Sequence, residues 1–99
     1  MSSFVQIMQL QTSKIDEIRA AVDEWQKATQ GKRTVARSAV CQDRDNPGRY
    51  SVIVFFESYE DAMKNSALPE TDTLAKKTAA LSDRPPTFVN LDIIEERLV

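Results

Sequence analysis

Histidine is absent from this chain of 99 residues, and cysteine occurs once, at Cys41. The absence of histidine removes the commonest general base and the commonest ligand of zinc and haem iron. A single cysteine cannot form a disulfide within the chain, and Cys41 has no histidine to activate it as a nucleophile. We therefore expect no metal site and no cofactor, and we interpret Cys41 as a small packing residue.

The chain also lacks long apolar segments and an excess of positive charge. No segment approaches the roughly 20 apolar residues of a membrane span, and the first residues lack the layout of a signal peptide. Thirteen Lys and Arg against fifteen Asp and Glu give a net charge of −2 and a pI near 5.1. Nucleic-acid-binding proteins usually present a basic face. We expect a cytoplasmic protein with neither a nucleic-acid partner nor a membrane partner.

The overall composition of the chain is typical of one globular domain. The hydrophobic fraction is 41% and the charged fraction is 28%, which are ordinary values for such a domain. Two glycines and four prolines are too few and too scattered to form a linker. We therefore predict a single domain over residues 1–99.

The chain is organised around a strand followed directly by a helix. In residues 50–56 both alternating sets of side chains are apolar, which is typical of a strand inside a sheet that is covered on both faces. Ser58 and Asp61 then have the spacing of a helix N-cap. Residues 4–10 are also largely apolar on both sets, which predicts a second interior strand.

Two helical regions are predicted from the spacing of apolar residues. The first begins with Ser13 as N-cap and buries a stripe that includes Ile18, Val22 and Trp25. The second begins at Ser58, is interrupted at Pro69, where a new helix starts, and ends near residue 82.

The remaining segments predict two edge strands and therefore a fold. Residues 33–42 alternate with charges and small side chains, a turn follows at 43–48, and residues 88–96 form the last strand. The order is then strand, helix, strand, strand, helix, strand. Right-handed crossovers place both helices on one face of a four-stranded antiparallel sheet, the α+β ferredoxin-like arrangement. Apolar side chains on the other face predict a homodimer that joins through the sheet faces.

Several segments carry a resemblance to a known family. They are residues 55–62 (FFESYEDA), Asn65-Ser66, the break at Pro69 and residues 88–92 (FVNLD). The chain is similar there to small members of the antibiotic biosynthesis monooxygenase-like group of the dimeric α/β-barrel superfamily. The resemblance implies two protomers joined sheet to sheet. It also implies a cavity between the sheet and the helices of each protomer, which holds a small apolar or aromatic molecule.

The same resemblance implies a possible chemistry. Oxygenases of this group oxidise electron-rich aromatic or polyketide-like substrates without a cofactor, using Asn, Trp, Arg and Tyr around the cavity. Tyr50, Asn65 and Arg37 are the matching ligand-binding candidates here, while Trp25 fits the buried stripe of its helix. Catalytic residues are not identified by the sequence. The haem-degrading branch requires a histidine, which this chain lacks.

Two alternatives remain open. The first is a dimer without catalysis, which binds a metabolite or serves as a scaffold. The second, more remote, comes from residues 48–62, which resemble the third strand of an RNA-recognition motif with Tyr50 at a base-stacking position. The next stacking position falls on Val52, which cannot stack on a base.

Overall fold

A computed structural model describes residues 3–99 and confirms the predicted α+β ferredoxin-like fold. The elements in chain order are β1 (Phe4–Gln11), α1 (Ile15–Ala28), β2 (Val35–Gln42), β3 (Arg49–Phe56), α2 (Tyr59–Ser66), α3 (Pro69–Leu81) and β4 (Thr87–Asp92). The strands form one antiparallel sheet in the order β2-β3-β1-β4. The two strands that are apolar on both alternating sets, β1 and β3, are the central ones, as predicted.

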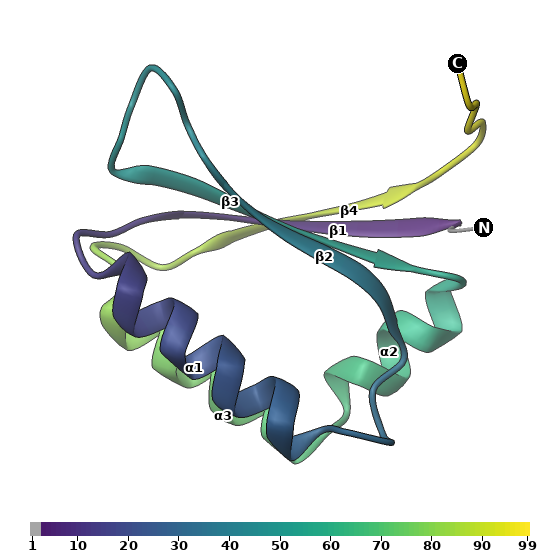
Figure 1. The fold of residues 1–99 in the computed structure, drawn as a ribbon, viewed down its shortest axis with the longest axis horizontal. Coiled ribbons are helices and arrows are strands. Elements are labelled where there is room, and N and C mark those ends of the chain that lie inside the picture. The colour runs from purple at the N-terminus through teal and green to yellow at the C-terminus, as the bar shows by residue number, and fades with distance from the viewer. Residues whose placement is uncertain (1–2) are drawn as a thin grey trace.

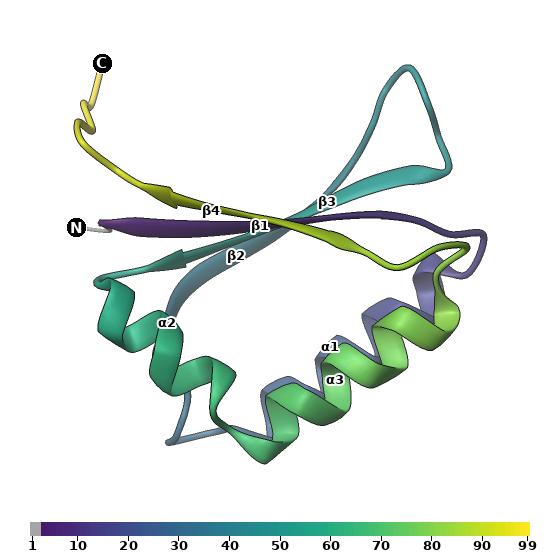
Figure 2. The same ribbon diagram turned by 180° about the vertical axis from the view of Figure 1, so that it is seen from behind.

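The molecule has two layers, a sheet and a set of helices on one side of it (Figure 1). Helices α1 and α3 pack against each other, with α1 in front of α3 in Figure 1 and behind it in Figure 2. The tip of the β2–β3 hairpin and the C-terminal segment project to the opposite side of the sheet. The sheet therefore has one covered face and one open face. Among residues 3–99, no helix is long and apolar enough to cross a membrane.

The second helical region starts and breaks where the sequence predicts. Ser58 is the N-cap of α2, and its Oγ accepts a hydrogen bond from the backbone N–H of Asp61 at 3.1 Å. Leu68 has extended backbone angles (φ −69°, ψ 133°), and Pro69 opens α3. A residue before proline avoids helical geometry, whereas proline suits the first turn of a helix.

The start of α1 differs from the prediction. Ser13 does not cap the helix, since the N-cap residue is Lys14 and no side chain bonds to the free N–H groups there. Thr12 takes part instead: its Oγ1 accepts from the backbone N–H of Lys14 at 2.9 Å and donates to the carbonyl oxygen of Leu81 at 2.6 Å. A buried threonine therefore ties the start of α1 to the end of α3.

The last strand is shorter than predicted. It ends at Asp92 rather than at residue 96. Its only neighbour in the sheet is β1, and Asp92 already pairs with Phe4, the first residue of β1. One further backbone hydrogen bond, from Ile93 N–H to the carbonyl oxygen of Ser3 at 2.8 Å, closes the ladder. The segment beyond it has no strand to pair with in the described part of the chain.

The tightest part of the core lies where α2 meets the sheet. Phe4, Phe56 and Ala62 are buried together, and Val35 and Val54 pack against them. Phe56 ends β3 two residues before Ser58, the N-cap of α2, so burial of this ring fixes the direction in which the helix leaves the sheet. Helices α1 and α3 lie beyond this cluster, and a cavity separates them from the sheet.

Candidate functional site

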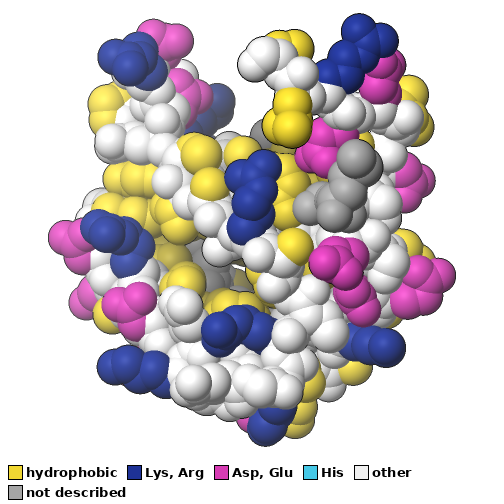
Figure 3. All heavy atoms as spheres, turned by 45° about the vertical axis from the view of Figure 1, so that its right-hand side comes forward, with side chains coloured by type: hydrophobic (Ala, Val, Ile, Leu, Met, Phe, Trp, Pro, Cys, Tyr) yellow, Lys and Arg dark blue, Asp and Glu magenta, His cyan; other side chains and the backbone are white. Residues whose placement is uncertain are grey.

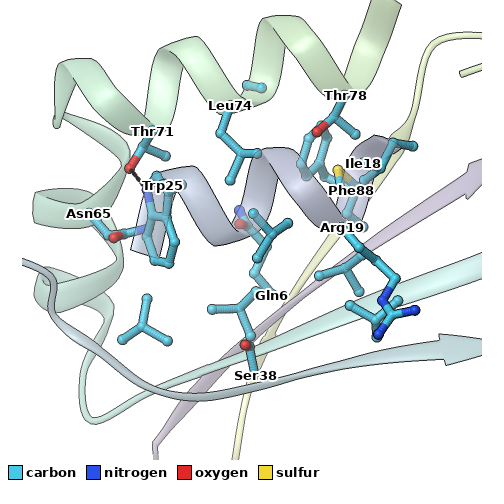
Figure 4. A pocket seen from close by; sticks show the side chains of 17 residues that line it. Gln6, Ile18, Arg19, Trp25, Ser38, Asn65, Thr71, Leu74, Thr78 and Phe88 are labelled. Carbon is cyan, nitrogen blue, oxygen red and sulfur yellow. Dashed lines mark hydrogen bonds between the residues drawn. The ribbon is translucent and has the colours of Figure 1, made fainter. Parts of the chain in front are cut away.

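The candidate site is a cavity of about 140 Å³ between the covered face of the sheet and the three helices (Figure 4). Most of its wall is apolar, with side chains such as Met8, Val54, Leu74 and Phe88. Few polar groups reach it, which is the usual composition of a small-molecule pocket. The break between α2 and α3 helps to form it, because Asn65 comes from one helix and Leu74 from the next.

Two buried polar residues, Asn65 and Thr78, line this cavity, and Asn65 is the one with an unpaired side-chain oxygen. Asn65 is only 8% exposed, and its Oδ1 has no hydrogen-bond partner among the described residues. Leaving a buried carbonyl-type oxygen unpaired costs about 1–3 kcal/mol. The amide can accept one or two hydrogen bonds through Oδ1 and can donate two through Nδ2. A hydrogen-bond donor brought against this oxygen would satisfy it.

Trp25 forms one wall of the cavity beside Asn65 (Figure 4). Its indole Nε1 donates a hydrogen bond to Thr71 Oγ1 at 3.0 Å, which fixes the ring between α1 and α3. The sequence interpretation placed Trp25 in a buried stripe with Ile18 and Val22. In the structure these three side chains do lie on one face of α1, but this face lines a cavity rather than a packed core. An oriented aromatic ring on a cavity wall can stack on an aromatic ligand.

Arg19 is a cavity residue that the sequence reasoning missed. It is the only charged side chain among the residues that line the cavity in the described part of the chain. It lies on α1 three residues before Val22, and this spacing is the signal that could have placed it at the edge of the stripe. Its side chain is 67% exposed and lies 3.7 Å from Asp16. Arg19 therefore stands where the cavity meets solvent.

Tyr50 lies outside this cavity. It lines a second, more polar hollow of about 290 Å³ at the end of the sheet where β3 begins, together with Arg49 and Arg84. Its hydroxyl oxygen accepts a long hydrogen bond from Gln42 Nε2 at 3.4 Å. The structure does not bring Tyr50 and Asn65 into one pocket.

Arg37 lies on the opposite, open face of the sheet. Its guanidinium carbon is 3.7 Å from the centre of the Phe55 ring, a cation–π contact. The cause is a β-bulge: Val35 pairs with Phe56 and Arg37 with Phe55, so Ala36 is an extra residue. Simple alternation would put Arg37 on the same face as Val35, which lines the cavity, and the bulge reverses this. Of the three predicted residues, the structure places only Asn65 in the cavity.

Two ion pairs join α3 to its neighbours beside the cavity, one to α1 and one to the segment between α1 and β2. Lys77 Nζ on α3 donates to Glu24 Oε2 on α1 at 2.9 Å, and this hydrogen bond and the lysine charge lower the pKa of Glu24. Lys32 Nζ donates to Glu70 Oε2 at 2.7 Å and lowers the pKa of Glu70, which is lowered further by a bond from its own backbone N–H.

Among residues 3–99, no group of three or more His, Cys, Asp or Glu could hold a metal ion.

Comparison with known proteins gives a match in structure alone. No protein-family model matches the sequence. No curated protein matches it either. Solved structures match over almost the whole chain, and three of them illustrate the range of organisms.

The first is named as a candidate antibiotic biosynthesis monooxygenase from Nitrosomonas europaea, with a TM-score of 0.75 and 14% identity over 95% of this chain and 93% of that chain. A conserved protein from Methanosarcina mazei Go1 has a TM-score of 0.79 and 11% identity over 93% of both chains. A candidate antibiotic biosynthesis monooxygenase from Deinococcus radiodurans has a TM-score of 0.77 and 14% identity over 97% of both chains. At such identities the likeness concerns the backbone. The chain has the fold of the antibiotic biosynthesis monooxygenase-like proteins.

Proposed function

We propose that this protein binds a small, largely apolar molecule with a hydroxyl group in the cavity between its sheet and its helices. The observation that carries the proposal is the buried, unpaired Oδ1 of Asn65 in a mostly apolar cavity. The hydroxyl of a phenol would donate to this oxygen. Trp25 would stack on the aromatic ring, because its indole is already held in place by Thr71.

A more specific proposal is that the protein oxidises such a molecule without a cofactor. In this reaction a methylene carbon beside a phenolic ring loses its two hydrogen atoms to one oxygen atom of O₂, which leaves as water. The second oxygen atom stays on the carbon as a carbonyl, so that O₂ is the only oxidant. The aromatic anion of the substrate reduces O₂, and the Nδ2–H groups of Asn65 would stabilise that anion. The names of the structural neighbours support this class of chemistry.

One observation favours the alternative, a protein that binds without turnover. Arg19 is the only ionisable residue among those described that line the cavity, and an arginine does not lose its proton in proteins. No carboxylate, histidine or lysine there could remove a proton from the substrate. The oxidation would then require a substrate that ionises by itself at neutral pH. Binding without oxidation needs only the apolar wall and Asn65.

A screen of phenols, anthrones and quinols separates these possibilities. Thermal shift measures binding, and oxygen uptake measures turnover with each compound that binds. We expect Asn65→Ala to lose binding and turnover together, while Tyr50→Phe serves as the control because Tyr50 lies outside the cavity. Binding without oxygen uptake supports the alternative. Binding that survives in Asn65→Ala would contradict the site.

We also propose that the protein is a homodimer joined through its open sheet faces. Cavity-lining side chains alternate along β1 and β3, so the intervening side chains point to the open face. Six of them, from the two central strands and β4, form an apolar open-face patch: Val5, Ile7, Ile53, Phe55, Val89 and Leu91. Figure 3 shows hydrophobic side chains between two projections of the molecule. A second copy would cover this patch.

A further inference from the structure

We propose that the ligand of this cavity is an elongated aromatic phenol with a carboxylate at the end opposite its hydroxyl, and that Arg19 binds this carboxylate. The inference rests on the proposed function, because it assigns the second end of the same ligand. It makes Arg19 the residue that selects acidic ligands over neutral ones.

The charged group and the unpaired buried amide of the cavity lie at opposite ends of it. Asn65 and Arg19 lie far apart along the cavity in Figure 4, with Leu74 and Gln6 between them. Asn65 is buried, so the hydroxyl end of a ligand lies inside. Arg19 is exposed and lines the cavity where it meets solvent, so the charged end of the ligand keeps contact with water. This orientation avoids the high cost of burying an ionised carboxylate in an apolar space.

Arg19 is free to take a new partner because its present one is held weakly. Its ion pair with Asp16 spans 3.7 Å, and the two side chains are 67% and 92% exposed. Such an exposed pair contributes little, since solvent screens both charges. A carboxylate at the edge of an apolar cavity has less solvent around it, and a guanidinium can bind both of its oxygens at once. The ligand carboxylate should therefore displace Asp16.

The test compares para-hydroxycinnamate with its methyl ester, which has the same phenol and nearly the same shape but no charge. Trp25 is the only tryptophan and lies in the cavity wall, so quenching of its fluorescence reports binding directly. Isothermal titration calorimetry gives the same dissociation constants independently. The variants are Arg19→Gln, Arg19→Lys and, as a control, Arg84→Gln, which removes the same charge from a residue outside the cavity.

We expect the unmodified protein to bind the acid about tenfold more tightly than the ester, as a charge-assisted hydrogen bond provides. Arg19→Gln should abolish this preference and leave the affinity for the ester unchanged. Arg19→Lys should retain part of the preference, and Arg84→Gln all of it. Equal affinity for acid and ester, or a preference that persists in Arg19→Gln, would overturn the role of Arg19 and leave the proposed function standing. Failure of both compounds to bind would overturn both.

Discussion

At the scale of single residues, Asn65 gives the clearest conflict between stability and binding. An amide at this position leaves Oδ1 buried and unpaired in the described structure, whereas an apolar side chain of the same shape would have no such group. Residues that cost stability in this way are found where a ligand supplies the missing partner.

We predict that Asn65→Leu raises the free energy of unfolding by about 1 kcal/mol, because it removes a buried unpaired oxygen without changing the side-chain volume much. The same substitution should weaken phenol binding about tenfold. Urea denaturation measures the first effect and tryptophan quenching the second. Asn90→Leu is the control, since its Oδ1 is exposed and accepts from Gln6 Nε2 at 3.1 Å. A loss of stability in Asn65→Leu would mean that the amide has a structural role.

Single residues also differ in how well their place in the structure could be predicted from the sequence. The position of Asn65 could be predicted because the family resemblance placed it in the second helical region, and the start of that region was predicted correctly. The face of the sheet on which Arg37 lies could not be predicted. No glycine or proline marks the bulge at Ala36, and one extra residue exchanges the two faces of a strand. Trp25 was placed on the right face, but apolar spacing does not distinguish a packed core from a cavity wall.

At the scale of elements, the predictions that rest on the composition of a single segment were correct. The apolar character of both faces predicted the central strands β1 and β3, and Pro69 predicted the break between α2 and α3. The start of α1 was wrong because its cap depends on Thr12, which bonds to Leu81, 69 positions away. A contact of that length is set by the packed structure and leaves no local pattern.

The two serines at the predicted helix starts provide a matched test. Ser58→Ala should lower the free energy of unfolding by about 1 kcal/mol, because Ser58 Oγ accepts from Asp61 N–H at the start of α2. Ser13→Ala should change it by less than about 0.5 kcal/mol, since Ser13 is exposed and caps nothing. Chemical denaturation of both variants gives the comparison. Equal losses would show that the start of α1 relies on Ser13 after all.

At the scale of the whole molecule, two ion pairs join α3 to α1 and to the segment that follows α1. The pKa values of Glu24 and Glu70 are lowered from 4.5 in the folded protein, by Lys77 and Lys32 respectively. A carboxyl group with a lowered pKa stabilises the fold above its unfolded pKa, and this contribution disappears as the pH falls through its folded pKa.

We therefore predict that stability decreases as the pH falls below about 4.5, and that the double variant Glu24→Gln/Glu70→Gln shows a smaller decrease over the same range. Thermal unfolding at a series of pH values measures the slope. Glu17→Gln is the control, because Glu17 is exposed on α1 and forms no ion pair in the described part of the chain. An unchanged slope in the double variant would contradict the assignment.

The open-face patch is the surface through which we propose that two copies of the chain assemble. Its members line up across three strands, where Val5 lies between Phe55 and Leu91, and Ile7 lies between Ile53 and Val89. Covering an exposed apolar side chain of this size stabilises an interface by roughly 1.5–3 kcal/mol when burial is complete. Val89 and Leu91 are exposed and Ile7, Ile53 and Phe55 are half-buried, whereas Val5 is already buried in the single chain. We propose that burial of the first five, contributed twice by a two-fold axis, holds two copies together at micromolar concentration.

We predict that Leu91→Glu converts the dimer into monomers, because it places a charge within the apolar contact and repeats that charge on the second copy. Sedimentation equilibrium at micromolar protein measures the mass. Met63→Glu is the matched control: Met63 lies on α2 and is 41% exposed, almost the same as Leu91 at 43%, but it belongs to the helical layer. A dimer lost in Met63→Glu and retained in Leu91→Glu would place the interface on the helices. A monomer mass for the unmodified protein would leave the patch uncovered and contradict the proposed assembly.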